Sequence, residues 1–581
     1  MGIPVSIRDI IIGANAAGGP DFDLIENSLR FRGGQRLGRS SWSGTGGNGQ
    51  GFGTLSMWVK AANIGSGMNL AHGGTTSPQQ AGTGILITNT GSLITNASYG
   101  SGSYQTLTAS GVYRDPSAWY HIVWRMAADG SETVWVNGVQ VLSGSNPQWG
   151  GWLLMNPGYP TYLGFGGIGD NGTYSQIYLA EVHGTYKTYY TASNFGKFNS
   201  DGVWIPKEVS GITYGTNGFY LDFSDPGNIG ADRSGNGNNF TPTSFELSNT
   251  TSTNYDWMED TPTNNHATWN AIFNSNQSNG DYIGNLTLAE ANMRATQGGN
   301  LSRAGFATQP LGIGGKYYWE GDQGANWGGQ AGCSTVIGFG FCRSTTSVST
   351  HYRQWVYYGL WWLGTGNGQG AQLQAEIIWA GSQQSTISLS NDFRPGRIAG
   401  IAIDTTASTN NVRLYVDGSL VGTGSFNFAG VPAEYQRGLM PYTQINSQPN
   451  QFSYCRLGSF PLQRTPPAGH VVPSSANQPA PSLPTTITGT FTGNNNSDGP
   501  FIHTGCIPGR IQYGSVDVLY QNRLSQSNVD FLSNGFKLRS TTSNSGTVSY
   551  TVTTTHSGGE YSGKKVPFGG NNVWPATAVS N

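Results

Sequence analysis

The chain has 581 residues, too many for a single hydrophobic core, and its formal net charge of −2 at pH 7 gives no basic surface for nucleic acid or an anionic membrane. Only 10% of the residues are charged whereas 12% are aromatic, so the chain has enough apolar surface to fold. Its 87 glycines follow no collagen period, and the chain prefers Ser, Thr, Asn, Val and Tyr over strong helix formers. We therefore predict an all-β protein of three or four domains.

Residues 1–26 are interpreted as an arm that is either disordered or docked on a partner, and docking is the favoured interpretation. Its apolar run, Ile10, Ile11 and Ile12, is too short for a signal peptide or a membrane span. These isoleucines would otherwise lie in water, so they are the candidate docking residues. We expect the protein to be made and kept soluble in a cytoplasm, without insertion into a membrane.

Residues 27–225 are predicted to form a first sandwich or jelly roll, because short runs with period two alternate with turn residues. Asn137–Gly138 and Asp129–Gly130 are dipeptides typical of two-residue hairpin turns. The expected strands lie at residues 28–34, 53–61, 84–89, 119–127, 132–142, 161–167 and 177–184.

The order of motifs in this unit resembles the laminin-G-like, concanavalin-type jelly roll. The motifs are NSLRF, LSMWVK, WYHIVWRM, VWVNGVQV and LAEVHG. The resemblance implies two antiparallel sheets packed face to face.

Residues 226–298 are turn-rich and are interpreted as a strap that connects two sandwiches. Residues 285–296 suit either a short helix or a strand. Asp222, Asp225 and Asp232 could bind Ca²⁺, but Asx turns are the favoured interpretation.

Residues 299–460 are predicted to form a second sandwich, and GKYYWE, VIGFGF and GIAIDTTASTNNVRLYVDG resemble SPRY-type domains. Tyr415–Gly418 repeats the pattern of Trp135–Gly138, an aromatic strand residue followed by a turn dipeptide and an aliphatic return strand. We therefore predict two related sandwiches in tandem. The expected strands lie at residues 315–322, 334–342, 355–364, 375–381, 397–405, 411–423 and 452–460.

A proline-rich stretch at 461–485 is predicted to be a semi-extended linker. Residues 486–581 follow as a small C-terminal β-domain, with strand alternation at 485–493, 515–523, 529–541 and 547–555.

The sequence offers no catalytic set. A glycosidase needs two carboxyl groups at a defined separation, and the nearest string, Asp21–Glu26, begins with Asp and precedes the first core strand. There is no nucleophile elbow, no HExxH and no phosphate loop before a helix. The four cysteines lack zinc-like spacing and are interpreted as buried small hydrophobes; they are Cys333, Cys342, Cys455 and Cys506. We expect no enzyme activity, no metal and no cofactor.

Carbohydrate binding is the alternative chemistry, because aromatic rings stack on the apolar faces of sugars beside Asn, Gln and Asp. Burial between sheets explains most of the aromatic residues in the second unit. Trp327, Trp355 and Trp362 are the candidates for exposed rings.

The chain from 27 to 460 also resembles a group of bacteriophage virion proteins. The shared words, in order, include NSLRF, SMWVK, LAEVHG, NFGKFNSDGVWIPKE, YGTNGFYLDFSD, GADRSGNGNNF and DTPTNN. The resemblance implies a structural protein of the particle, most often a tail-fibre or receptor-binding component that attaches to host-surface glycan. Capsid decoration or a head fibre is one alternative, and a polysaccharide depolymerase is another. It also implies other virion proteins as partners of the arm, with a homotrimer as our hypothesis.

Overall fold

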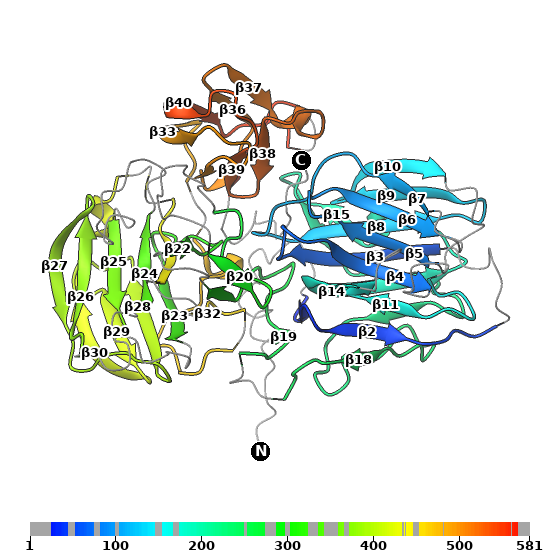
Figure 1. The fold of residues 1–581 in the computed structure, drawn as a ribbon, viewed down its shortest axis with the longest axis horizontal. Helices are drawn as coiled ribbons and strands as arrows, with labels where there is room; N and C mark the ends of the chain where they lie inside the picture. Colours follow the sequence, from blue (N-terminus) through cyan, green and yellow to red (C-terminus); the bar gives the residue numbers. More distant parts are fainter. Residues whose placement is uncertain are drawn as a thin grey trace.

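A computed structural model shows three β-rich domains (Figure 1). Two sandwiches lie side by side, and the smaller third domain lies over the junction between them. The structure describes residues 25–44, 53–74, 82–98, 104–145, 154–166, 173–248, 253–273, 286–296, 303–323, 335–341, 358–364, 371–432, 435, 437–445, 452–459, 461–479, 482–558 and 561–567.

The first sandwich consists of two antiparallel sheets whose inner faces share one apolar core. One sheet has the order β10 (Val139–Ser145), β9 (Ser131–Val136), β8 (Tyr120–Met126), β3 (Gly53–Ala61), β14 (Gln176–Tyr186), β1 (Ser28–Arg32) and β19 (Trp257–Met258), and β17 (Phe219–Leu221) also pairs with β14. The other has the order β18 (Thr241–Thr243), β2 (Arg36–Arg39), β11 (Thr161–Leu163), β4 (Met68–Gly74), β5 (Gly82–Ile87), β6 (Leu93–Ser98) and β7 (Tyr104–Thr108). Two short hairpins accompany them: β12 (Phe165–Gly166) with β13 (Thr173–Tyr174), and β15 (Gly196–Phe198) with β16 (Trp204–Pro206).

The second sandwich is built in the same way around its own core. Its first sheet has the order β20 (Thr287–Ala289), β21 (Arg294–Thr296), β32 (Phe452–Arg456), β23 (Lys316–Gln323), β28 (Ile398–Asp404), β29 (Val412–Val416) and β30 (Ser419–Gly424). Its second has the order β22 (Arg303–Phe306), β31 (Met440–Ile445), β24 (Thr335–Phe341), β25 (Tyr358–Leu363), β26 (Gln374–Trp379) and β27 (Ser382–Ser388).

The two sandwiches have the same topology. The series β14-β3-β8-β9-β10 corresponds strand for strand to β32-β23-β28-β29-β30, and β2-β11-β4-β5-β6-β7 corresponds to β22-β31-β24-β25-β26-β27. The equivalent hairpins turn at Asn137–Gly138, with φ of 50° and 79°, and at Asp417–Gly418, with φ of 52° and 84°. Both turns need the left-handed conformation that Asn, Asp and Gly tolerate. The predicted pair of related sandwiches is confirmed, and the SPRY likeness of the second stays a prediction.

The third domain packs a larger and a smaller sheet around a separate core. The sheets contain β33 (Thr486–Asn494), β40 (Ser545–Thr553), β36 (Arg510–Tyr513) and β37 (Val516–Leu519), then β34 (Phe501–His503), β39 (Gly535–Leu538) and β38 (Val529–Leu532), with a separate pair β35 (Cys506–Ile507) and β41 (Val566–Pro567). Val203 and Ile205, on either side of Trp204 in the first domain, belong to this core. The third domain therefore docks on the β15–β16 hairpin.

Helical structure in the described residues consists of 3-10 turns, and Tyr435 is also helical. The turns are η1 (Ala192–Asn194), η2 (Phe428–Gly430), η3 (Ser475–Asn477) and η4 (Tyr520–Ser525). Within those residues, no helix has the length and apolar character needed to cross a membrane.

The strap and the linker differ from the sequence expectation. β18 and β19 come from the predicted strap yet extend the two sheets of the first sandwich, because their edge strands β2 and β1 offer unpaired backbone groups. Residues 287–296 form the β20–β21 hairpin, which is the strand alternative of the two that the sequence left open. The proline-rich segment is packed, not a free spacer: Val471 forms backbone hydrogen bonds with Lys316 and Tyr318.

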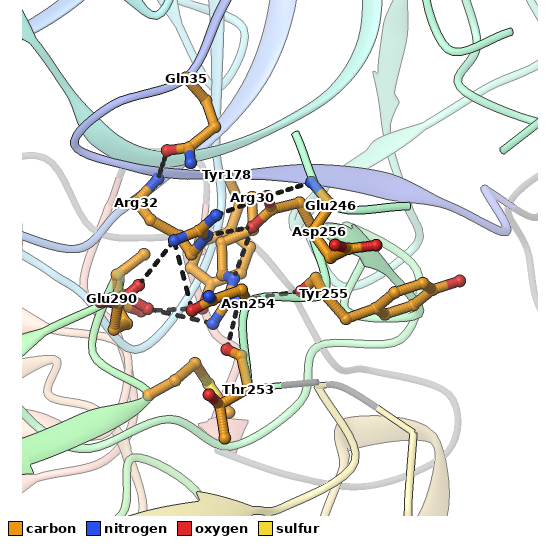
Figure 2. A network of polar contacts seen from close by, with 12 residues as sticks. Arg30, Arg32, Gln35, Tyr178, Glu246, Thr253, Asn254, Tyr255, Asp256 and Glu290 are labelled. Atoms are coloured by element: carbon orange, nitrogen blue, oxygen red, sulfur yellow. Dashed lines mark hydrogen bonds and ion pairs between the residues drawn. The ribbon is translucent and has the colours of Figure 1, made fainter. Parts of the chain in front are cut away.

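A buried polar network joins the two sandwiches. Figure 2 shows Arg30 and Arg32 of β1 reaching Asp256, which precedes β19. Arg32 also pairs with Glu290 in the β20–β21 turn at 3.2 Å, and the side chains of Arg30 and Asp256 are fully buried. We call Arg30, Arg32, Asp256 and Glu290 the junction network.

Candidate functional site: a polar pocket on the first sandwich

The pocket lies on the outer face of the β10-to-β19 sheet. Along β3, Leu55, Met57 and Val59 belong to the core between the sheets, so the intervening Ser56 and Trp58 point to the outer face. In many antiparallel sandwiches this outer face is solvated. Here every residue of β3 is buried, because the β15–β16 hairpin and the strap cover the sheet.

A bulge in β14 brings Glu181 to this face. Strict alternation from the core residue Leu179 would place Glu181 and His183 in the apolar core. The pairing register with β3 instead shifts between Ala180 and His183, and Glu181 has a φ of 48°. The extra residue keeps Val182 in the core and leaves Glu181 and His183 in the pocket.

The pocket has a volume of about 200 Å³. Its walls come from segments distant in sequence, and it combines aromatic rings with two carboxyl groups, two imidazoles and one amine. The lining residues are Ile25, Ser56, Trp58, His121, Glu181, His183, Phe195, Pro206, Lys207, Glu208, Val209 and Tyr220.

His121 is held between two tryptophans. Its ring stacks on Trp58 at 4.7 Å and on Trp204 at 5.8 Å between ring centroids. Burial, with a smaller contribution from His183, lowers the pKa of His121 to about 3. His121 is therefore neutral at physiological pH.

The hydrogen bonds of His121 exclude a serine nucleophile at this position. The Trp204 indole can only donate, and it donates to His121 Nδ1 at 3.0 Å. The proton of neutral His121 is thus on Nε2, which donates to Ser56 Oγ at 2.9 Å. Because His121 is a donor in this bond, it cannot take the proton of Ser56 as a general base.

Glu181 is the polar acceptor of the pocket. The hydroxyl of Tyr220 donates to Glu181 Oε2 at 2.9 Å, and burial followed by the charge of Glu181 raises the pKa of Tyr220, which keeps it protonated. The His183 ring stacks on Tyr220 at 4.2 Å, and its Nε2 lies 3.4 Å from Glu181 Oε2. The Glu181 side chain is 19% exposed, so its remaining lone pairs can accept from ligand hydroxyls.

The tryptophan candidates from the sequence do not form this site. Trp362 is fully buried in the core of the second sandwich, with its ring 5.2 Å from that of Phe393. The prediction for Trp362 is corrected: packing against Phe393 turns its ring into the core between the sheets. Trp327, Trp355, Ile10, Ile11 and Ile12 lie outside the described residues.

The interpretation of Asp222, Asp225 and Asp232 as Asx-turn residues is confirmed. Their carboxylates accept from the backbone N–H groups of Ser224, Gly227 and Ser234 at 3.1, 2.9 and 2.8 Å, respectively. Among the residues that the structure describes, no group of three His, Cys, Asp or Glu side chains is placed to hold a metal ion. Cys506 is fully buried as expected, and burial raises the pKa of its thiol to about 11.

Sequence reasoning missed the residues of the pocket. One signal was present: in LAEVHG, a glutamate stands where period two demands an apolar residue, which indicates a bulge. The other lining residues gave no signal, because they meet only after the hairpin and the strap fold over the sheet.

No protein-family model matches the chain, and no curated protein matches it. Similar solved structures include domains LG4-5 of the mouse laminin alpha1 chain, with 8% identity over 79% of this chain and 90% of that chain and a TM-score of 0.25. The CBM40 of Ruminococcus gnavus IT-sialidase bound to alpha2,3 sialyllactose has 16% identity over 25% of this chain and 89% of its own, with a TM-score of 0.18. The enzymatically active domain of bacteriophage CBA120 tailspike protein 2 has 14% identity over 28% of this chain and 25% of its own, with a TM-score of 0.21. These likenesses concern the β-sandwich architecture alone.

Proposed function

We propose that the chain is a non-enzymatic structural protein of a phage virion, a tail-fibre or receptor-binding component that attaches to glycan on the host surface. In this role the arm at 1–26 docks on other virion proteins, and the chain assembles as a homotrimer in the host cytoplasm. The order of motifs shared with phage virion proteins supports the location.

The observation that carries the proposal is the junction network. Domains in one chain normally move relative to one another unless their interface is large and apolar. Here Arg30 and Arg32 are held by Asp256 within the first sandwich. They reach the second through Glu290: Arg32 pairs with its carboxylate at 3.2 Å, and Arg30 donates to its backbone carbonyl at 3.3 Å. Around them, Trp58, Trp119 and Tyr178 of the first sandwich pack in one cluster with Met293 and Tyr454 of the second. Such a joint suits a particle component that must hold its modules at a fixed angle.

Glycan attachment is supported by the chemistry of the pocket. Glu181 and Ser56 offer acceptor and donor groups for sugar hydroxyls, and Lys207 lines the same rim. The tautomer of His121 leaves Ser56 without a base. The site is therefore suited to binding and lacks this route to acyl transfer.

Adhesion tests the proposal. Fluorescently labelled full-length chain is incubated with host cells before and after periodate oxidation of their surface glycans. We expect binding that periodate abolishes and that Glu181→Gln weakens by about tenfold, because a charge-assisted hydrogen bond is lost. Glu26→Gln, at an exposed position outside the pocket, is the matched control and should bind as the unchanged chain does.

Two outcomes would replace the proposal. Release of reducing ends from purified capsule or lipopolysaccharide would indicate a depolymerase, for which Glu181 and Glu208 are the two carboxyl groups that share the pocket. Retention on the phage head, without adhesion to host cells, would indicate capsid decoration.

A further inference from the structure

A second cleft lies where the three domains meet. Its volume is about 490 Å³, within the range of about 300–1,000 Å³ typical of sites for small ligands. One wall consists of the loop after β3 and residues Asn89 and Arg114 of the first sandwich. The strap and β20 supply a second wall, and Lys537 and Arg539 of the third domain supply the rest.

The cleft carries an excess of positive charge. Asp530 pairs with Arg114 at 2.6 Å and with Arg539 at 2.6 Å. Asp498 pairs with Arg539 at 2.5 Å and with Lys537 at 3.2 Å. Three cations thus share two carboxylates, which leaves one positive charge in surplus.

These charges are shielded from water. Lys537 has a side chain only 2% exposed, and burial lowers its pKa to about 8, so it remains mostly charged at neutral pH. The Arg114 and Arg539 side chains are 22% and 15% exposed. A guanidinium has five N–H donors in a planar fork, and the Nε of Arg114 is shielded from water without a hydrogen-bond partner. An anion in the cleft would meet donors with reduced hydration and therefore bind more strongly than at an open surface.

The remaining lining suits a sugar ring. Asn63, Asn89 and Asn292 bring amides that can both donate to and accept from hydroxyls. Ile64, Leu286 and Leu288 are partly buried apolar residues on the same lining. An apolar edge beside amides and a cation cluster matches a pyranose that carries a carboxylate.

We propose that this cleft binds an acidic saccharide, with the carboxylate of a sugar acid at Arg114 and Arg539. Lys537 adds its positive charge beside them, while its ammonium donates to the carbonyls of Ile272 and Gly499 and pairs with Asp498. The cleft shares no lining residue with the pocket at Glu181, so the two sites can be tested separately. Because all three domains contribute, an occupied cleft also stabilises their docking through mass action.

Calorimetric titration of the full-length chain with an oligogalacturonate tests the proposal. The comparison ligand is the same oligosaccharide with its carboxyl groups reduced to alcohols. We expect the acidic form to bind at least tenfold more tightly, because a charge-assisted bidentate contact is lost in the reduced form. Equal affinity for the two forms, or equal affinity for inorganic phosphate alone, would overturn the proposal.

Three variants locate the site. Arg114→Gln removes one cation, and Thr287→Trp fills the cleft from an exposed position of β20 while leaving all the ion pairs in place. Both should weaken binding of the acidic form by about tenfold or more. Arg510→Gln removes an exposed arginine on β36 and should bind normally. If Thr287→Trp folds and binds normally, or if Glu181→Gln instead abolishes binding, the cleft is not the site.

Discussion

The hydroxyl of Tyr178 in the first sandwich donates a hydrogen bond of 2.8 Å to the carbonyl oxygen of Ala291, at the tip of the hairpin that opens the second. The tip is unusual because Glu290, Ala291 and Asn292 all have left-handed backbone, with φ of 55°, 54° and 66°. Each such residue costs about 1–2 kcal/mol relative to right-handed backbone. Docking against Tyr178 and the junction network therefore stabilises a turn that the hairpin alone would not favour.

Tyr178→Phe tests this bond. The variant leaves the buried carbonyl of Ala291 without its donor, and we expect a loss of about 1–2 kcal/mol in the free energy of unfolding. The loss is measured from urea unfolding followed by tryptophan fluorescence. Tyr174→Phe, at a side chain 39% exposed, serves as the control and should stay within about 0.5 kcal/mol. Equal effects of the two variants would contradict the role of the bond.

Asp256→Ala tests the junction network. It leaves the guanidinium groups of Arg30 and Arg32 in a buried site without their shared carboxylate, and losing one partner of a buried pair costs about 3–5 kcal/mol. Asp517→Ala breaks an exposed pair with Arg510 and should cost at most about 1 kcal/mol. We also expect limited proteolysis of Asp256→Ala to cut between the sandwiches. An uncut chain of normal stability would show that the network does not hold the joint.

His121 makes stability depend on pH. Its pKa is about 3 in the folded chain and about 6.5 when exposed in the unfolded chain. Above pH 6.5 the imidazole of His121 is neutral in both the folded and the unfolded chain, and its full contribution to the free energy of unfolding is present. As the pH falls from 6.5 toward 3, the unfolded chain takes up a proton that the folded chain does not, so up to about 1.4 kcal/mol is lost per pH unit.

His121→Gln should therefore reduce the slope of the free energy of unfolding against pH by the contribution of one proton. The side-chain oxygen of the glutamine can still accept a hydrogen bond from Trp204. Urea midpoints at pH 4.5, 5.5 and 6.5 measure the slope for both chains. Parallel profiles would contradict the buried, neutral state of His121.

Gly138 packs against Trp204, which orients His121 of the polar pocket. It has a φ of 79°, and a Cβ added there would lie 2.3 Å from the Trp204 ring. Gly396 has a similar φ of 85° but open space around it. Both Gly→Ala variants are destabilised by the left-handed backbone that alanine must adopt. Only Gly138→Ala must also displace the ring of Trp204.

We expect Gly138→Ala to be about 1–3 kcal/mol less stable than Gly396→Ala. Gly138→Ala should also weaken glycan adhesion, because Trp204 orients His121 in the pocket. Urea unfolding measures the first effect and the host-cell assay the second. If the two variants unfold at the same urea concentration, Trp204 does not pack on this turn.

Much of the fold could be predicted because its signals are local. Period-two runs and the turns at Asn137–Gly138 and Asp417–Gly418 predicted two related sandwiches, and the strand order bears this out. Alternation tells which residues share a face, but it does not tell which face a distant segment covers. It could not place Asp256 beside Arg30, 226 residues away.

The site was less predictable for the same reason. Trp362 belongs to an aromatic run in which alternation allows either face, and packing against Phe393 places it inside. Glu181 reaches the pocket through one extra residue in β14, and Tyr220 reaches it from a later strand. Contacts of this kind depend on tertiary packing rather than on local preference.

Cryo-electron microscopy of phage particles that carry this chain tests the central claim most directly. We predict density on the tail that fits the two sandwiches and the third domain as one rigid unit, with the angle between the sandwiches unchanged from that fixed by the junction network. Particles without such density, or density on the head in its place, would contradict the proposed role as a tail-fibre or receptor-binding component.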